Sequence, residues 1–432
     1  MKRNIRIARF AFAAAIALAE ASMPGVAQTA AGLKAGAARV DITPAVADLP
    51  APFKTIHDSI YVRVLMLDNG ASRSVIVVAD VPTIGAAVHA GMARRISDQT
   101  HTPLNNIMVA VTHNHNTVRI DTTPFGQLLP GSAKIAEMTI NRTLEAVKQA
   151  EANLRPAKAG YAEGTFYLAA TNQQNSDRPD PRPVDRTLGV FKIESVSGEP
   201  IAFVINNGPQ PTFGMVNPSE VTSDVSGATE RYVEQRFNDK AVVLYTVGSP
   251  PGIAYSPRRS IPGTKPADAY GMMNAVGTIL GEEVLATSAR IKTTSDVKIT
   301  AAHQVLQCPG KVTTPLNQPT HCSNEPGSKL PPCVFTDKDT DPVNLQIGVL
   351  NLGVLTLVHA DANVNTAVWT KLKALAPPNT AFVSLVYGPM KYVMEDAAYP
   401  SNSYPVTAST AKVGCAEQGF ITKAMSMIKE TR

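Results

Sequence analysis

Short apolar runs alternate with longer segments of helical periodicity along most of this chain. This alternation limits the possible folds more than any other feature. The runs are rich in Val, Ile and Leu and end in turn or polar residues, as strands do. The predicted strands are 61–68, 74–81, 107–112, 188–194, 200–206, 241–247, 344–351, 354–359 and 381–387, and the predicted helices are 86–100, 133–153, 226–237, 270–290 and 366–375. Strands that alternate with helices predict an α/β fold. We expect mixed β-sheets flanked by helices.

The length after residue 27 allows one large domain or two, and we expect a single large domain over residues 28–432. Of the 432 residues, 44% are hydrophobic and 17% are charged, so the chain can bury a sizeable core. The run 75–79 contains no polar residue, which is typical of a strand buried on both faces.

The first 27 residues have the three parts of a secretory signal peptide. Lys2, Arg3, Arg6 and Arg9 form a basic start, and residues 10–19 are an apolar run that is too short for a membrane anchor. Gly25 and Ala27 are small residues at positions −3 and −1 of a cleavage site after Ala27. We therefore expect an exported protein, periplasmic or secreted. No later stretch reaches the roughly 18 uninterrupted apolar residues of a membrane helix, so we expect no integral membrane segment after signal removal.

The net charge gives no reason to expect a nucleic-acid partner. Cleavage after Ala27 removes four positive charges and one negative charge from the net charge of +5, which leaves the mature chain at +2. A nearly neutral protein has no strong electrostatic attraction for nucleic acid or for an anionic membrane surface. We expect a small molecule as partner, and the oligomeric state stays open.

The four cysteines all lie in the last third of the chain, at Cys308, Cys322, Cys333 and Cys415. An even number in an exported protein favours two disulfides, for which three pairings exist. We prefer Cys308 with Cys322 and Cys333 with Cys415, because the first two border one short loop. The region 308–342 is rich in proline and cysteine and is predicted to be an inserted surface loop.

Two predicted strands end in clusters of side chains that could hold a metal ion. The run 107–111 leads into His113 and His115, and the run 354–358 leads into His359 and Asp361. Side chains two residues apart in an extended chain point the same way, so each pair could face one ion or substrate. Imidazole and carboxylate are ligands that suit zinc. The alternative is that His359 and Asp361 cap a strand end and pair with each other.

Several motifs resemble the neutral ceramidases and their bacterial relatives. Residues 37–44, Ala-Ala-Arg-Val-Asp-Ile-Thr-Pro, resemble the opening of that family, and residues 112–115, Thr-His-Asn-His, resemble its His-x-His motif. Residues 210–212 stand where the family has His-Pro-Thr, and the tyrosines after position 386 resemble its closing run. The resemblance implies the fold of the ceramidase catalytic domain and zinc-dependent amidase chemistry.

The resemblance also implies roles for individual residues. His113 would be a zinc ligand, and His115 would lie beside the substrate with a catalytic role. Tyr392 would be a zinc-ligand tyrosine, with Tyr399 nearby in a catalytic role. Ser256, which matches a Ser-Pro of the family, would hold the substrate or act as nucleophile.

Two positions depart from the family's zinc site. Gln210 stands where the family has a second zinc histidine, and Asn363 stands near its zinc glutamate. Amide oxygens are weak zinc ligands beside imidazole and carboxylate. His359 and Asp361 could replace the lost ligands and complete a catalytic zinc site with His113.

The sequence thus predicts an exported hydrolase that cleaves an amide or ester bond of an acylated small molecule with metal-activated water. Zinc is the expected cofactor. The alternative is a non-catalytic binding protein that kept the pocket of the family and lost its zinc site.

Overall fold

The structure is a computed structural model that describes residues 32–120, 132–171, 184–251, 253–255, 265–311, 327, 329, 339–388, 391–401 and 404–432. The signal peptide 1–27 lies outside these residues and remains a prediction.

The larger of two main sheets has eight strands. In sheet order they are β11 (Val242–Val247), β9 (Pro200–Asn207), β8 (Thr187–Ser195), β6 (Arg155–Thr165), β1 (Lys34–Asp41), β3 (Tyr61–Asp68), β4 (Arg73–Ala79) and β5 (Ile107–Val111). Neighbouring strands are antiparallel except for the parallel pairs β4–β5 and β9–β11 at the two edges. The predicted mixed sheet is confirmed.

The smaller sheet has the order β13 (Thr300–Lys311), β14 (Asp339–Asn351), β15 (Thr356–Ala360) and β17 (Thr380–Val383). Its last two strands, β15 and β17, are parallel. Three two-stranded pairs complete the strands: β2 (Thr55–Ile56) with β10 (Glu220–Val221), β7 (Ala169–Thr171) with β12 (Ile253–Tyr255), and β16 (Ala362–Val364) with β18 (Lys391–Val393).

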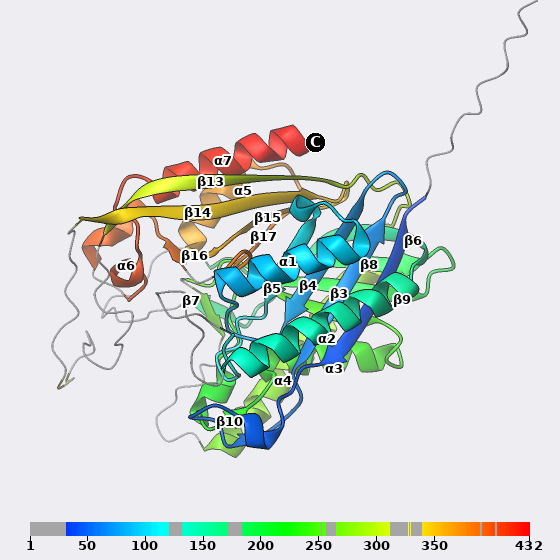
Figure 1. Cartoon of the computed structure of the whole chain (residues 1–432), viewed down its shortest axis with the longest axis horizontal. Helices are drawn as coiled ribbons and strands as arrows, with labels where there is room; N and C mark the ends of the chain where they lie inside the picture. Colours follow the sequence, from blue (N-terminus) through cyan, green and yellow to red (C-terminus); the bar gives the residue numbers. More distant parts are fainter. Residues whose placement is uncertain are drawn as a thin grey trace, which may run out of the picture.

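The helices cover the outer faces of the two stacked sheets (Figure 1). The larger sheet is covered by α1 (Ala86–Thr100), α2 (Ser132–Ala152), α3 (Asp224–Arg236) and α4 (Pro266–Ala289), and the smaller sheet by α5 (Thr366–Leu375) and α7 (Ala416–Thr431). The short helix α6 (Tyr404–Ala408) and four 3-10 turns, η1 (Val46–Asp48), η2 (Leu104–Asn106), η3 (Phe213–Val216) and η4 (Asp396–Ser401), lie in the connections. The result is a four-layer arrangement of helices, sheet, sheet and helices.

The strand β4 shows why its sequence contains no polar residue between 75 and 79. Val75 and Val77 face the core beneath α1 and α2, while Ile76 and Val78 face the core between the two sheets. All four are at most 1% exposed. The expected burial on both faces is confirmed.

Several predicted elements are shifted by a few residues at their ends, and two predictions need a larger correction. The predicted strand 381–387 ends at Val383, because Leu385 and Tyr387 have positive φ angles of 60° and 81° that a strand does not allow. The predicted loop 308–342 begins and ends in strands, since β13 runs to Lys311 and β14 starts at Asp339. Pro309 fits in β13 because the register shifts between Cys308 and Gly310, and a bulge tolerates a missing N–H.

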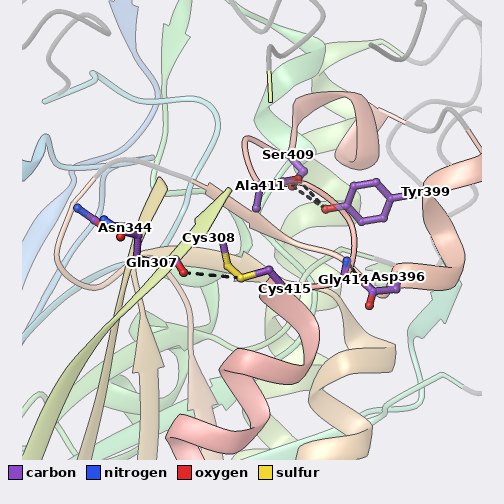
Figure 2. The surroundings of a disulfide bond; sticks show 9 residues. All are labelled: Gln307, Cys308, Asn344, Asp396, Tyr399, Ser409, Ala411, Gly414 and Cys415. Carbon is purple, nitrogen blue, oxygen red and sulfur yellow. Dashed lines mark hydrogen bonds between the residues drawn. A yellow bond between two sulfur atoms is a disulfide. The ribbon is translucent and has the colours of Figure 1, made fainter. Parts of the chain in front are cut away.

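A disulfide joins Cys308 in β13 to Cys415 at the start of α7 (Figure 2). Their Cα atoms are 5.8 Å apart, although the two residues are separated by 107 positions in the sequence. Both preferred pairings, Cys308 with Cys322 and Cys333 with Cys415, are therefore wrong, because the tertiary fold brings α7 against the smaller sheet. Cys322 and Cys333 lie outside the described residues.

None of the helices in the described part of the chain combines the length and the apolar character that a membrane-spanning helix requires.

His89 of α1 stabilises the β5 edge of the larger sheet. Its imidazole donates a hydrogen bond to the carbonyl of Val109 in the edge strand β5, and the residue is 5% exposed. Burial lowers the pKa of His89 to about 4, against the tendency of the Val109 bond to raise it. The folded protein therefore holds this ring neutral.

We expect the stability of the wild type relative to a His89→Gln variant to fall as the pH is lowered from about 6.5 to about 4. Over this window the unfolded chain binds a proton at His89 that the folded chain does not bind, which costs about 1.4 kcal/mol per pH unit. Urea unfolding of both proteins at several pH values measures the difference. A difference that does not change with pH would contradict a neutral, buried His89.

Candidate active site

The candidate site begins where β5 ends. His113 follows this strand with a φ of +54° and is 3% exposed. Its Nδ1 lies 2.8 Å from the carbonyl oxygen of Pro82, which can only accept a hydrogen bond. Nδ1 therefore carries the proton and Nε2 carries the lone pair. Burial lowers the pKa of His113 to about 4, and the positive charge of Arg119 acts in the same direction.

Two further side chains lie close to the Nε2 atom of His113, and a third forms a hydrogen bond with the same side chain. The Nε2 atom of His115 is 3.4 Å away, and the Nδ2 atom of Asn363 in β16 is 3.3 Å away. Gln210, which follows β9, also forms a side-chain hydrogen bond with His113. Two imidazoles and two carboxamides, carried by segments that follow β5, β9 and β15, thus meet at one point.

Tyr392 belongs to the same neighbourhood. It is the Cα partner of Asn363 in the parallel pair β16–β18, and paired residues direct their side chains to the same face. Tyr392 is 8% exposed. The structure therefore brings four of the predicted site residues, His113, His115, Gln210 and Tyr392, into one region around Asn363.

A pocket of about 360 Å³ opens beside His115. Its apolar wall contains Pro52, Phe53 and Met215, and Arg119 contributes a positive charge. His115 is less buried than His113, so it is the histidine that a molecule in this pocket would contact. A pocket of this size and lining suits a small molecule with an apolar part.

His359 and Asp361 lie elsewhere. Asp361 forms an ion pair with Lys391, and its Oδ1 accepts a hydrogen bond of 3.0 Å from the backbone N–H of Gln346. Burial raises the pKa of Asp361, and the Lys391 charge opposes this. His359 packs against Tyr387, with ring centroids 5.2 Å apart. Asp361 thus has its partners outside the group around His113, and it does not pair with His359.

Tyr399 has a hydroxyl that is engaged with the backbone (Figure 2). It donates to the carbonyl of Ala411 at 2.9 Å and lies 3.2 Å from the hydroxyl of Ser409, which in turn donates to the carbonyl of Tyr392. Tyr399 is therefore placed to support the segment that carries Tyr392. Ser256 lies outside the described residues, and its role stays a prediction.

The donor set around His113 does not fit a catalytic zinc site. Such sites use three ligands drawn from histidine, carboxylate and thiolate. Two imidazoles are present here and the phenol of Tyr392 lies in the same region, but Gln210 and Asn363 offer only neutral amide oxygens. The Oδ1 atom of Asn363 is buried and has no hydrogen-bond partner among the described residues, but it brings no charge to offset that of a metal ion. Among the described residues, no three His, Cys, Asp or Glu side chains are placed to hold a metal ion.

Sequence reasoning missed two parts of this site, the amide of Asn363 facing His113 and the carbonyl of Pro82. Asn363 was visible as the residue near the position of the family's zinc glutamate, but nothing in the sequence showed that its amide would face His113. The carbonyl of Pro82 left no signal at all, because any residue supplies a carbonyl.

Comparison with known proteins agrees with this architecture. No protein-family model matches the sequence, and no curated protein matches it. Among solved structures, a neutral ceramidase from Pseudomonas aeruginosa superposes with a TM-score of 0.74, covering 92% of this chain and 74% of that chain at 15% sequence identity. A structure described as a ceramidase complexed with C2 gives a TM-score of 0.74, with 92% and 75% coverage and 14% identity. The chain therefore has the fold of the neutral ceramidases, as its sequence motifs led us to expect.

Proposed function

We propose that this protein hydrolyses an amide or ester bond of a small acylated molecule at the site formed by His113, His115, Gln210 and Asn363. One observation carries the proposal: two imidazole Nε2 atoms 3.4 Å apart meet two carboxamides beside a largely apolar pocket. Such a convergence of a potential base with hydrogen-bond donors is the arrangement that acyl transfer requires.

The chemistry follows from the ring atoms. Nε2 of His113 bears a lone pair, so the N–H at Nε2 of His115 can donate to it, which leaves Nδ1 of His115 as the basic atom. Nδ1 of His115 takes a proton from water as the water oxygen attacks the carbonyl carbon. The C–N or C–O bond then breaks, and the same proton passes to the leaving nitrogen or oxygen.

The two carboxamides suit the charge that develops during this reaction. The N–H groups of Asn363 and Gln210 can donate to the carbonyl oxygen as it becomes an oxyanion. Burial of the site strengthens these hydrogen bonds, since less water competes for them. The neighbouring structures are named ceramidases, which supports an acylated lipid amide as the substrate class.

Zinc dependence and export remain proposals of their own. The resemblance to the neutral ceramidases implies zinc, whereas the neutral donor set around His113 argues against it. The steps above therefore rest on the side chains alone. Export rests on the pattern in residues 1–27.

We expect mature protein to release acid from N-acyl amides or O-acyl esters and to contain much less than one zinc ion per chain. The physical reason is the replacement of charged or imidazole ligands by Gln210 and Asn363. Metal analysis of purified residues 28–432, with an assay before and after chelation, measures both quantities. Stoichiometric zinc that is lost in His113→Ala, together with activity that chelation abolishes, would instead support the metal-dependent mechanism.

A binding protein without catalysis is the second candidate. It is favoured by the carboxamides of Gln210 and Asn363, since a family zinc site that loses two ligands loses its metal chemistry. In that case acylated molecules would bind to the wild type but no product would form, even over long incubation. Product formation by the wild type that the active-site variants lack would exclude this alternative.

A further inference from the structure

A second cavity lies at the open edge of the larger sheet. It has a volume of about 520 Å³ and shares no lining residue with the pocket beside His115. Its walls come from α1, from η2 and the start of β5, and from β13 and β14 of the smaller sheet. This volume is within the range of sites that bind small organic molecules.

The two sides of this cavity differ in character. Ala90 and Ala93 of α1, with Leu104 and Ile107, form an apolar wall. The opposite wall carries His303 of β13 and Gln346 of β14. A molecule with an apolar body and a polar group would match both walls.

Three histidines surround Tyr387 on the polar side. The centroid of the Tyr387 ring is 5.5 Å from that of His89, 5.0 Å from that of His303 and 5.2 Å from that of His359. Tyr387 has a φ of +81°, a conformation that costs a tyrosine energy and is enriched at functional sites.

Gly348 makes room for this cluster. In the smaller sheet it is paired with His303 on one side and with His359 on the other. A Cβ atom at position 348 would lie 2.2 Å from the hydroxyl of Tyr387 and 2.3 Å from the His359 ring. Only glycine leaves space for the Tyr387 ring to lie over β14 between His303 and His359.

Several ring nitrogens in this cluster lack partners. Nε2 of His89 and both ring nitrogens of His359 are buried and have no hydrogen-bond partner among the described residues. Buried polar atoms are almost always paired, and an exception calls for a missing water, ion or ligand. The cluster therefore contains hydrogen-bonding capacity that none of the described residues uses.

The tautomers show which groups a ligand must supply. His89 uses its other nitrogen to donate to Val109, so its Nε2 can only accept a hydrogen bond. Nε2 of His303 lies 2.8 Å from the Oε1 atom of Gln346, so a neutral His303 offers its Nδ1 as an acceptor. Two imidazoles thus present lone pairs, and a matching ligand must donate hydrogen bonds.

Two other classes of ligand, carboxylates and ammonium ions, fit this cavity poorly. A carboxylate has no proton to donate to these lone pairs at neutral pH. An ammonium ion would meet the positive charge of Arg94, which also lines the cavity, and Asp361 is not available as its counter-ion because it already pairs with Lys391. A neutral hydroxyl group can donate a hydrogen bond and carries no positive charge, so an apolar molecule with a hydroxyl group fits the cavity.

We propose that this cavity is a second ligand site, which binds a small apolar molecule that carries a hydroxyl group, such as a phenol or an alcohol. The hydroxyl donates to His89 or His303, the two histidines of the cluster that line the cavity, and the apolar body packs against α1. The site is separate from the proposed hydrolytic site and does not depend on its activity.

Phenol and toluene form a matched pair of probes, because they differ mainly in the hydroxyl that donates. Binding of each to the full mature protein can be measured by NMR titration. We expect replacement of His89 by phenylalanine to lower the ratio of phenol affinity to toluene affinity about tenfold, the effect of losing one buried hydrogen bond. Phenol should also shift the ring ¹⁵N resonance of His89 in the wild type. A substitution that only loosens the cavity would weaken the binding of both probes alike, so it would leave this ratio unchanged.

His57→Phe is the control, since His57 is exposed and stacks on Tyr270 instead. It should leave the affinity ratio unchanged, as should His113→Ala. Three results would overturn the proposal: no binding of either probe, the same affinity ratio in the wild type and in His89→Phe, or tight binding of Zn²⁺ or Ni²⁺ that depends on His89. The last result would identify a metal site in place of an organic ligand site.

Discussion

Replacement of His115 by alanine is expected to lower the turnover of an acyl amide or ester about 100-fold or more. His115 lines the pocket and is the less buried of the two site histidines, so it is the group that can accept the proton from water. Loss of a general base costs a factor of about 10² to 10⁴ in rate. Steady-state kinetics on the wild type and the variant measure the change, which should fall mainly on kcat.

His57→Ala provides the matched control, because it removes an exposed histidine that does not line this pocket. Its turnover should equal that of the wild type. If His115→Ala kept full turnover while both proteins remained folded, the reaction would have to occur at another site. A comparison with Ser256→Ala adds a test of the serine, because complete loss of activity there would indicate covalent catalysis.

Removal of the disulfide is expected to lower the free energy of unfolding by about 4 kcal/mol. The bond between Cys308 and Cys415 closes a loop of 107 residues, and a cross-link over so long a loop strongly restricts the unfolded chain. Cys308 is fully buried in the core between the smaller sheet and α7, so alanine fits there without a clash. Denaturant unfolding of a Cys308→Ala/Cys415→Ala variant measures the loss.

Peptide mapping without reduction gives an independent check of this pairing. It should recover one linked pair of peptides that contain Cys308 and Cys415. Linkage of Cys308 to Cys322 would contradict the structure and would remove the reason for the large effect. A Cys322→Ala/Cys333→Ala variant is the matched control, because it leaves the long-range bond intact.

Local sequence patterns predicted much of the fold because their causes are local. The helices α1 and α5 begin and end at the predicted residues, and β3 matches its prediction. Their apolar periodicity reports directly which side of the element is buried.

The long strand β13 and the helix α7 were not predicted. β13 carries exposed and buried residues in turn at the sheet edge, and Pro309 obscured its signal.

Sequence patterns revealed only part of the candidate site. His113 and His115 lie two residues apart, so the pattern alone placed them together. Gln210 and Asn363 reach His113 from segments about 100 and 250 positions away, and no local pattern reports such a contact. The same limit applies to His359 and Asp361, which have the spacing of metal ligands but have their contacts outside the group around His113.

By itself, the sequence determined the α/β class, the two-sided burial of the central strands and the residues at the end of β5, since neighbouring residues decide these properties. Only the tertiary structure decided which strand ends face one another, which cysteine bonds to Cys308, and where the hydroxyl of Tyr387 fits over Gly348. These contacts join residues far apart in the chain. Such contacts depend on how the two sheets stack and on which side chains leave space for others. Both depend on the packing of the entire domain and not on any local segment.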